Sequence, residues 1–335
     1  MLAALFKGNR DITLCDYSLR ALEKKELLIQ VAYCGVCGTD HHIFEGKAPS
    51  KIPVILGHEY SGVVVDMGSP VSGFSIGDKV SINPNIYCGY CDYCKKGKIN
   101  FCENHQALGV TLNGGFAEYS IIPVTQAYLL PSDFDLNLAA FAEPLSCCLR
   151  GMQHAAIKPG DNVIVIGGGS IGLLMVQLVK NAGAGAILIE PESLKRSLGK
   201  ELGADHAFDP GNNQLAEKIK DITHSHIDVI IECVGKSASV QMAVQLADKG
   251  TRIVIFGLAP SDHNVTFNLQ HLFHNELNIL TSYLNPFTFS TAINMLVGGK
   301  VNVRKLISDT IALKNVNNIF NDSTNSSIKQ QIINN

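Results

Sequence analysis

The alternation of apolar and polar positions changes character near residue 160 of this chain. Before that point, apolar residues occur in short runs that Gly and Pro separate. Such a pattern is typical of short strands, and it predicts strands at residues 27–33, 62–66, 79–82 and 116–122. We therefore expect a twisted, β-rich or barrel-like unit in residues 1–145.

From residue 160 onward, apolar strands alternate with segments of helical length and periodicity. The predicted strands are residues 162–166, 186–189, 228–232, 252–256 and 278–282, and the predicted helices are residues 173–182, 194–202, 215–222 and 239–247. This alternation indicates an α/β fold with a doubly wound parallel sheet. A helical pattern at 288–297 and short strands follow. We therefore expect domains at 1–145, 146–284 and 285–335, the last returning to the first domain.

Length and composition are those of an ordinary globular protein. The chain has 335 residues, of which 46% are hydrophobic and 17% charged, enough for two domains with sizeable cores. The net charge of −3 points neither to nucleic acid nor to a membrane surface. The first residues are too short for a secretory signal, so we expect the cytoplasm, where thiols stay reduced. The ten cysteines are then expected to be thiols or metal ligands.

A glycine-rich turn follows the first strand of the second domain. Gly167, Gly169 and Gly172 satisfy G-x-G-x-x-G between a strand and a helix, where a backbone can approach a pyrophosphate. Glu190 ends the next strand, and its carboxylate can accept hydrogen bonds from ribose hydroxyls and would repel a 2′-phosphate. We therefore predict NAD. The predicted cofactor-binding residues are Gly167, Gly169, Ser170, Ile171, Gly172, Glu190 and Arg196. NADP stays open, because Lys195 and Arg196 could reach a phosphate.

Four cysteines lie within fifteen residues, at Cys88, Cys91, Cys94 and Cys102. A reducing compartment disfavours a disulfide knot. The spacing C-x2-C-x2-C-x7-C lets four thiolates close a tetrahedron around zinc, which leaves no open position for a substrate. The segment is poor in apolar residues, so a bound metal should contribute to its folding.

A second, scattered group of residues also has the types that bind metals. It comprises Cys37-Gly-Thr39-Asp-His41-His42, Gly57-His58-Glu59 and Ala142-Glu143-Pro144. Cys34 and Cys37 also form a CxxC. That pair follows a strand in the β-rich half and does not open the helix of a βαβ unit, so a thioredoxin-type redox role is disfavoured.

Several motifs occur along the chain in one order. They are Gly35-Val36-Cys37-Gly38-Thr39-Asp40, Gly57-His58-Glu59, the four cysteines, Gly114-Gly115-Phe116-Ala117-Glu118-Tyr119 and the glycine-rich turn. The ordered set resembles the zinc-dependent medium-chain dehydrogenases over residues 1–311. Within that family, Ala142-Glu143-Pro144-Leu145 resembles the sorbitol and polyol dehydrogenase branch. The resemblance implies a Rossmann domain joined to a β-rich, GroES-like catalytic domain.

The resemblance also implies two zinc ions per subunit. A structural zinc would bind Cys88, Cys91, Cys94 and Cys102. A catalytic zinc would bind Cys37, His58 and a carboxylate, and would keep a position open for water or substrate. Whether Glu59 or Glu143 ligates it directly stays open. Because this donor set is harder than four thiolates, Mn²⁺ or Fe²⁺ could replace the catalytic zinc.

The activity that the resemblance implies is reversible, NAD-dependent oxidation of a secondary alcohol of a polyol, such as sorbitol or arabitol, to a ketose. Zinc would polarise the substrate hydroxyl, Thr39 would accept its proton and His42 would pass the proton to water. Glu59 belongs to the same catalytic group. We expect a homodimer or homotetramer, and neither a nucleic-acid nor a membrane partner.

Other functions stay open. A polyol-phosphate dehydrogenase, of the galactitol-1-phosphate or arabitol-phosphate type, needs a cationic pocket, for which Lys47 is a candidate. Glu143-Pro144 disfavours a simple alcohol dehydrogenase and an L-threonine 3-dehydrogenase. The acidic net charge opposes a zinc-stabilised nucleic-acid-binding module, and the complete ligand set opposes an NAD-binding protein without chemistry. The Asn-rich end departs from typical family endings, so we expect the final dozen residues to be less ordered.

Overall fold

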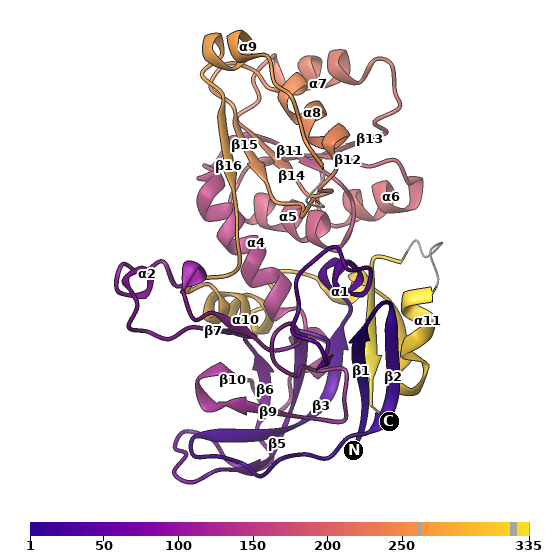
Figure 1. The fold of residues 1–335 in the computed structure, drawn as a ribbon. Coiled ribbons are helices and arrows are strands. Elements are labelled where there is room, and N and C mark those ends of the chain that lie inside the picture. The colour runs from indigo at the N-terminus through magenta and orange to yellow at the C-terminus, as the bar shows by residue number, and fades with distance from the viewer. Residues whose placement is uncertain (260–262, 322–326, 335) are drawn as a thin grey trace. The chain divides into compact units, whose positions relative to one another are not determined.

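The computed structural model describes residues 1–259, 263–321 and 327–334, and it divides into two compact units (Figure 1). Unit 1 comprises Met1–Ser146, Leu284–Gly299 and Val303–Asn335, and unit 2 comprises Cys147–Tyr283 and Lys300–Asn302. The chain passes from unit 1 to unit 2 within helix α4 (Ala142–Ala155). Among the described residues, no helix is both long enough and apolar enough to cross a membrane.

Unit 1 is built on mainly antiparallel sheets. In its described part, the largest sheet has seven strands in the order β10-β6-β5-β3-β18-β17, and β9 also pairs with β3. Smaller sheets have the orders β2-β1-β4 and β7-β8. The strands are β1 Leu2–Gly8, β2 Asp11–Asp16, β3 Glu26–Gly35, β4 Val54–Ile55, β5 Glu59–Met67, β6 Lys79–Ile82, β7 Asn85–Ile86, β8 Gln106–Ala107, β9 Tyr119–Pro123, β10 Ala127–Leu129, β17 Ile307–Ala312 and β18 Lys329–Ile333.

The helices of unit 1 are short and join these strands. They are α1 Gly38–Phe44, α2 Asp92–Lys95, α3 Leu136–Ala139, α10 Phe289–Val297 and α11 Val316–Asn321, with 3₁₀ turns η1 Ile99–Phe101, η2 Val124–Gln126, η3 Arg304–Leu306 and η4 Leu313–Asn315. The core between the sheets is apolar, and Ile29, Tyr60 and Phe116 within it are fully buried. Burial alternates along most of β3, whereas the first four residues of β5 are all buried, which fits two strands at the centre of the sheet.

The predicted strands of the first half are largely confirmed. The segment 79–82 is β6, the segments 27–33 and 62–66 lie inside the longer β3 and β5, and the segment 116–122 begins three residues later, as β9. The expectation of a less ordered C-terminal end is wrong for residues 327–334. There β18 pairs antiparallel with β3 and parallel with β17, and Ile332 enters the core. Residues 324–326 and 335 of that end lie outside the described residues.

Unit 2 is a parallel sheet with the strand order β13-β12-β11-β14-β15-β16. The sequence leaves β11 in one direction through β12 and β13, then returns to its other side with β14. This reversal is the hallmark of a Rossmann fold, and ligands bind outside the carboxyl ends of the strands where it occurs. The strands are β11 Asn162–Ile166, β12 Gly185–Ile189, β13 His206–Phe208, β14 Val229–Glu232, β15 Arg252–Ile255 and β16 Asn278–Thr281.

The elements predicted for unit 2 agree closely with the structure. The five predicted strands correspond to β11, β12, β14, β15 and β16 within one residue at each end. The four predicted helices correspond to α5 Ser170–Asn181, α6 Ser193–Glu201, α7 Leu215–Thr223 and α8 Ser237–Leu246, and 288–297 corresponds to α10 in unit 1. Sequence reasoning missed β13 and the helix α9 (Leu269–His274), which are too short to show a clear period. It also missed α4, whose second part lies in unit 2.

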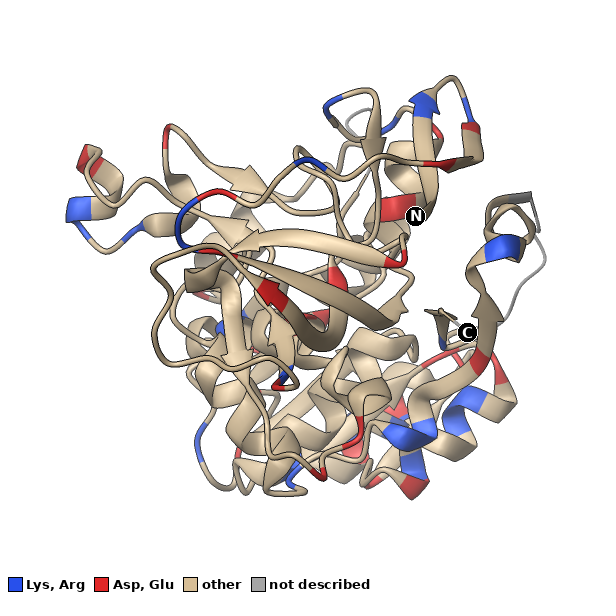
Figure 2. Ribbon diagram, turned by 90° about the horizontal axis from the view of Figure 1, so that it is seen from below, with Lys and Arg blue, Asp and Glu red and all other residues tan. Residues whose placement is uncertain are grey.

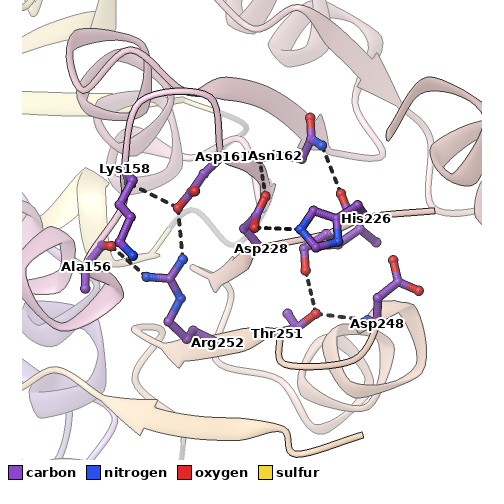
Figure 3. Close-up of polar contacts among 10 residues, drawn as sticks. Ala156, Lys158, Asp161, Asn162, His226, Asp228, Asp248, Thr251 and Arg252 are labelled. Carbon is purple, nitrogen blue, oxygen red and sulfur yellow. Dashed lines mark hydrogen bonds and ion pairs between the residues drawn. The ribbon is translucent and has the colours of Figure 1, made fainter. Parts of the chain in front are cut away.

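A polar network ties together the amino ends of the strands in unit 2 (Figure 3). Asp161 accepts hydrogen bonds from Arg252 and from the backbone of Lys158, and Arg252 also donates to the carbonyl of Ala155. Beside them, Asp228 accepts from the backbone N–H of Asn162 at 2.8 Å. These bonds satisfy exposed and partly buried backbone groups at the end of the sheet opposite to the glycine-rich turn, so we assign the network a structural role.

Charged residues of both signs are interspersed along the chain. Figure 2 shows Lys and Arg on the same helices and loops as Asp and Glu, so neither sign dominates the side that is drawn. This distribution matches the small net charge of −3.

Candidate metal and nucleotide sites

Three of the predicted metal ligands come together in unit 1. One donor atom each from Cys37, His58 and Glu59 lies within 4.8 Å of the other two. Cys37 is the residue before α1, His58 lies directly before β5, and Glu59 is the first residue of β5. His58 and Glu59 are buried, and Cys37 is half-buried.

The pairing of β3 with β5 builds this cluster. Gly35, the last residue of β3, is opposite Glu59 in the ladder, so the turn after β3 places Cys37 beside the start of β5. The glycine is required there, because a Cβ at residue 35 would lie 2.4 Å from Oε2 of Glu59. Cys37 and Glu59 are 22 positions apart in sequence, but they are neighbours in space because the end of β3 lies opposite the start of β5.

Asp40 is a member of the site that sequence reasoning did not assign. Its Oδ1 atom lies 3.4 Å from Nδ1 of His58, and its Oδ2 atom accepts a hydrogen bond from the backbone N–H of Cys37 at 2.8 Å. Burial lowers the pKa of His58, but the negative charges of Asp40 and Cys37 raise it well above 6.5 in the metal-free protein. The carboxylate thus constrains the orientation of the ring. The sequence feature that could have assigned Asp40 to the site is its position three residues after Cys37, in a short helix.

Lys329 is a second member that no sequence signal indicated. It begins β18, and its ammonium group forms an ion pair with Glu59. Burial lowers the pKa of Lys329, but the charges of Glu59 and Cys37 outweigh this effect and raise it. The amine is therefore a cation inside the protein, next to two candidate metal ligands.

The other predicted residues lie in unit 1 but outside the cluster of three. Glu143 is buried in the first turn of α4, and its carboxylate is not one of the three grouped donors. Thr39 and His42 lie on α1, two and five residues after Cys37, and both are partly buried. The structure therefore groups Glu59, rather than Glu143, with the thiol and the imidazole.

A hydrogen-bond network holds the start of α4. The side chain of Ser146 donates to the carbonyl of Glu143 at 2.6 Å and accepts from Nδ2 of Asn285 at 2.7 Å. Asn285 in turn accepts from Asn85, the first residue of β7, at 2.8 Å. The turn that carries Glu143 is thereby connected to the strand from which the four-cysteine lobe departs.

The four cysteines form the second candidate metal site. One sulfur each from Cys88, Cys91, Cys94 and Cys102 lies within 4.8 Å of the others. The backbone N–H of Cys88 donates to the sulfur of Cys102, and that of Cys91 donates to the sulfur of Cys88. Burial raises the pKa of Cys88, but backbone donors at Tyr90 and Cys91 outweigh it and bring this pKa to about 6.

Both donor sets fit zinc. A thiolate, an imidazole and a carboxylate are the ligands of catalytic zinc sites, whereas four thiolates form closed structural sites. The N–H groups that point at the sulfurs of the lobe stabilise thiolates, which is the form that binds metal. All ten cysteines are unbridged in the structure.

The glycine-rich turn lies at the carboxyl end of β11, where the strand order of unit 2 reverses. Gly167 has a φ of +102°, which favours glycine. Gly172 contacts the turn so closely that a Cβ there would lie 1.8 Å from the carbonyl oxygen of Gly167. Gly169 precedes α5, which Ser170 and Ile171 begin, so the first N–H groups of this helix are available to an anion.

Glu190 and Arg196 lie at the carboxyl end of the neighbouring strand, β12. The carboxylate of Glu190 accepts hydrogen bonds from the backbone N–H groups of Gly168 and Glu192, at 2.6 and 2.8 Å. Arg196 donates to the carbonyl of Glu190 and forms an ion pair with Asp209 at 3.2 Å. The acid is thus beside the glycine turn, while the guanidinium is committed to other protein groups.

The sequence is similar to two families of domains. Residues 23–132 match the Alcohol dehydrogenase GroES-like domain, and residues 170–298 match the Zinc-binding dehydrogenase domain. D-arabinitol dehydrogenase 1 of Uromyces fabae is 31% identical over 92% of this chain and 89% of its own length. D-arabitol-phosphate dehydrogenase of Enterococcus avium is 33% identical over 90% of this chain and 87% of its own length.

The fold is similar to that of solved dehydrogenases. A zinc-binding dehydrogenase from Sinorhizobium meliloti 1021, solved bound to NADP, has a TM-score of 0.96 and 36% sequence identity. The match covers 99% of this chain and 98% of that protein. The similarity therefore extends over both units rather than over one domain.

Proposed function

The chain belongs to the zinc-dependent medium-chain dehydrogenases and to their polyol branch, and on this premise we propose that it oxidises a secondary alcohol of a polyol to a ketone. The cofactors are zinc and a nicotinamide dinucleotide. Unit 1 carries the metal chemistry, and unit 2 binds the nucleotide. The reaction transfers a hydride from the carbinol carbon to NAD⁺ and releases the hydroxyl proton, so the products are a ketose, NADH and H⁺.

The observation that carries this proposal is the buried cluster of Cys37, His58 and Glu59. Its three donors are the number that a catalytic zinc takes from a protein, which leaves a position for a substrate oxygen. Zinc bound there supplies Lewis acidity that makes the substrate hydroxyl more acidic. Asp40 orients His58, and Glu143, which is buried in the first turn of α4, is our candidate for contact with substrate or water.

The proton of the substrate hydroxyl leaves through α1. Thr39 follows Cys37 by two residues, and its hydroxyl oxygen accepts the proton. His42 lies three residues after Thr39 on the same helix and passes the proton to solvent, a role that suits an imidazole. The two side chains belong to one short helix, so their spacing is set by local structure rather than by a loop.

NAD is the cofactor that unit 2 favours. The carboxylate of Glu190 is at the end of β12, where the ribose of a dinucleotide binds in this fold. Arg196 and Lys195, the cations that a 2′-phosphate would need, are paired with Asp209 and Glu192. The NADP bound to the Sinorhizobium meliloti relative keeps the phosphorylated cofactor as the alternative.

The second candidate substrate is a polyol phosphate, which the name of the Enterococcus avium relative suggests. A phosphate needs a cation near the substrate. Lys47, the sequence-based candidate, forms an ion pair with Glu45 at 2.6 Å and is half exposed. Its charge is therefore already compensated, and we favour an unphosphorylated polyol.

Turnover of free and phosphorylated four- to six-carbon polyols, each with NAD and with NADP, tests these proposals. We expect NAD reduction with a free polyol and little with its phosphate. His58→Ala should abolish turnover and leave NAD affinity nearly unchanged. Full activity of this variant, or of the metal-free protein, contradicts the mechanism, and a preference for phosphorylated substrates reverses the choice between the two substrate classes.

We further propose that the chain works in the cytoplasm as a homodimer that pairs through β16, or as a homotetramer built from two such dimers. β16 forms an edge of its sheet, and the nearby α9 exposes Leu269 and Phe273, each by more than three quarters. An unpaired edge strand beside apolar side chains suits contact with a second copy. Sedimentation of wild type and of a Phe273→Asp variant tests this, and a wild-type monomer at micromolar concentration contradicts it.

A further inference from the structure

Lys329 and Glu59 form an ion pair in the interior of unit 1. The amine nitrogen lies 2.5 Å from Oε2 of Glu59, and 4% of the lysine side chain and 2% of the glutamate side chain are exposed. The same nitrogen donates to the carbonyl oxygen of Val36 at 3.0 Å. Burying two charges costs solvation energy that their attraction often fails to recover, so stability alone gives little reason for such a pair.

The backbone places this lysine at the metal cluster. β3 lies between β5 and β18, and Glu59 and Lys329 are the first residues of these two flanking strands. Gly35 ends β3 between them, and its missing side chain leaves the space into which the carboxylate of Glu59 extends. The last strand of the chain therefore delivers a cation to a candidate metal ligand 270 residues away.

One carboxylate oxygen of Glu59 is thereby committed. A carboxylate with two free oxygens can chelate a metal, whereas one whose Oε2 is held by an ammonium group offers a single oxygen. The positive charge of Lys329 also opposes a cation at the adjacent cluster, because like charges at such distances repel in a buried site. Both effects weaken Glu59 as a ligand and leave more of the metal open to water or substrate.

We propose that Lys329 is a positioning residue that limits how strongly Glu59 binds the catalytic metal and so keeps a substrate position open. The proposal rests on the metal site that the proposed function invokes. The proposal predicts a change in metal affinity, so its test does not depend on whether the protein oxidises a polyol.

Replacement of Lys329 by Met tests the proposal, since Met is unbranched and only one atom shorter, and removes the charge. Zinc affinity is measured by competition with a chromogenic chelator. The zinc that a Cys37→Ser variant still binds is subtracted, so that the measurement reports the cluster of Cys37 and not the four-cysteine lobe. We expect Lys329→Met to bind this zinc about tenfold more tightly and to lose kcat, while Lys329→Arg stays near wild type.

Lys79→Met is the matched control. Lys79 lies on β6 of the same sheet and donates to the carbonyl oxygen of Phe134 at 2.9 Å, away from the cluster. It should leave zinc affinity unchanged. Cobalt substitution adds a spectroscopic readout, since a second oxygen from Glu59 raises the coordination number and lowers the intensity of the visible bands in Lys329→Met. Unchanged or weaker zinc binding with an unaltered cobalt spectrum overturns the proposal.

A double variant keeps the proposal testable if Lys329→Met does not fold. Lys329→Met/Glu59→Gln removes both charges of the pair and leaves no unpaired buried ion. If the lysine acts through Glu59, this protein binds zinc as Glu59→Gln alone does. A double variant that binds zinc more than about threefold differently from Glu59→Gln shows that Lys329 acts by another route, and overturns the proposal.

Discussion

The Nδ1 atom of His58 lies 3.4 Å from Oδ1 of Asp40, and both side chains are buried. Asp40 also accepts a hydrogen bond from the backbone of Cys37, so one carboxylate contacts two of the three grouped metal ligands. This carboxylate fixes the orientation of the imidazole and the start of α1 at the same time.

Asp40→Asn should therefore weaken binding of the catalytic zinc. The amide can still accept from the backbone N–H of Cys37, but it lacks the charge that favours the ring orientation. We expect zinc affinity to fall by about 10–100-fold, measured by chelator competition. Asp78→Asn is the control, because Asp78 also accepts from a backbone N–H, that of Ser75, but in an exposed turn. Equal zinc affinity in the two variants contradicts the role given to Asp40.

Zinc binding should also depend on pH through His58. Burial lowers the pKa of this ring, but Asp40 and Cys37 raise it well above 6.5 in the metal-free protein. Because the folded pKa exceeds the unfolded one, the proton stabilises the metal-free protein fully below pH 6.5, and this stability is lost as pH rises through the folded pKa.

Zinc needs the neutral ring, so its affinity should change with pH in the opposite direction. We expect affinity to rise by about tenfold per pH unit for each displaced proton until the pH exceeds the folded pKa. Chelator competition at three pH values between about 6 and 8 measures the slope. A slope of zero in this window contradicts the pKa shift of His58.

The four-cysteine lobe should matter for stability before it matters for chemistry. Cys94→Ser removes one of four thiolates, so we expect one zinc fewer per subunit and a clearly lower midpoint of thermal unfolding. Turnover per remaining catalytic zinc should stay near wild type. Cys15→Ser, which changes a half-buried cysteine of β2 outside either cluster, serves as the control. A stable but inactive Cys94→Ser protein means that the two metal sites have been assigned the wrong way round.

Cofactor preference should shift when Glu190 is replaced. Loss of its carboxylate removes charged hydrogen bonds to the ribose, so Glu190→Ala should raise the KM for NAD on the order of tenfold and lower that for NADP. Glu217→Ala is the control, because Glu217 is an exposed glutamate of the same unit, in the first turn of α7. An unchanged NAD-to-NADP ratio in Glu190→Ala removes this residue from the ribose site.

Local patterns in the sequence were sufficient for much of the molecule. Strand β6 and the five predicted strands of unit 2 follow from apolar runs, because strand formation there depends on residues near one another in sequence. The four-cysteine lobe and the glycine-rich turn are likewise local, since each completes its geometry within about twenty residues. The short elements β13 and α9 were missed because they have no clear period.

The tertiary structure alone decided which carboxylate joins Cys37 and His58, and which cation lies beside it. The sequence left both Glu59 and Glu143 open as ligands, with Glu143 completing the expected trio, and only the pairing of Gly35 with Glu59 in the ladder brought Glu59 to the thiol. Lys329 carried no signal at all, because its contact with Glu59 depends on β18 being inserted beside β3. The sequence by itself thus determined the family, the fold class and the types of the ligands, while their final arrangement came from strand pairing between distant segments, which no local pattern encodes.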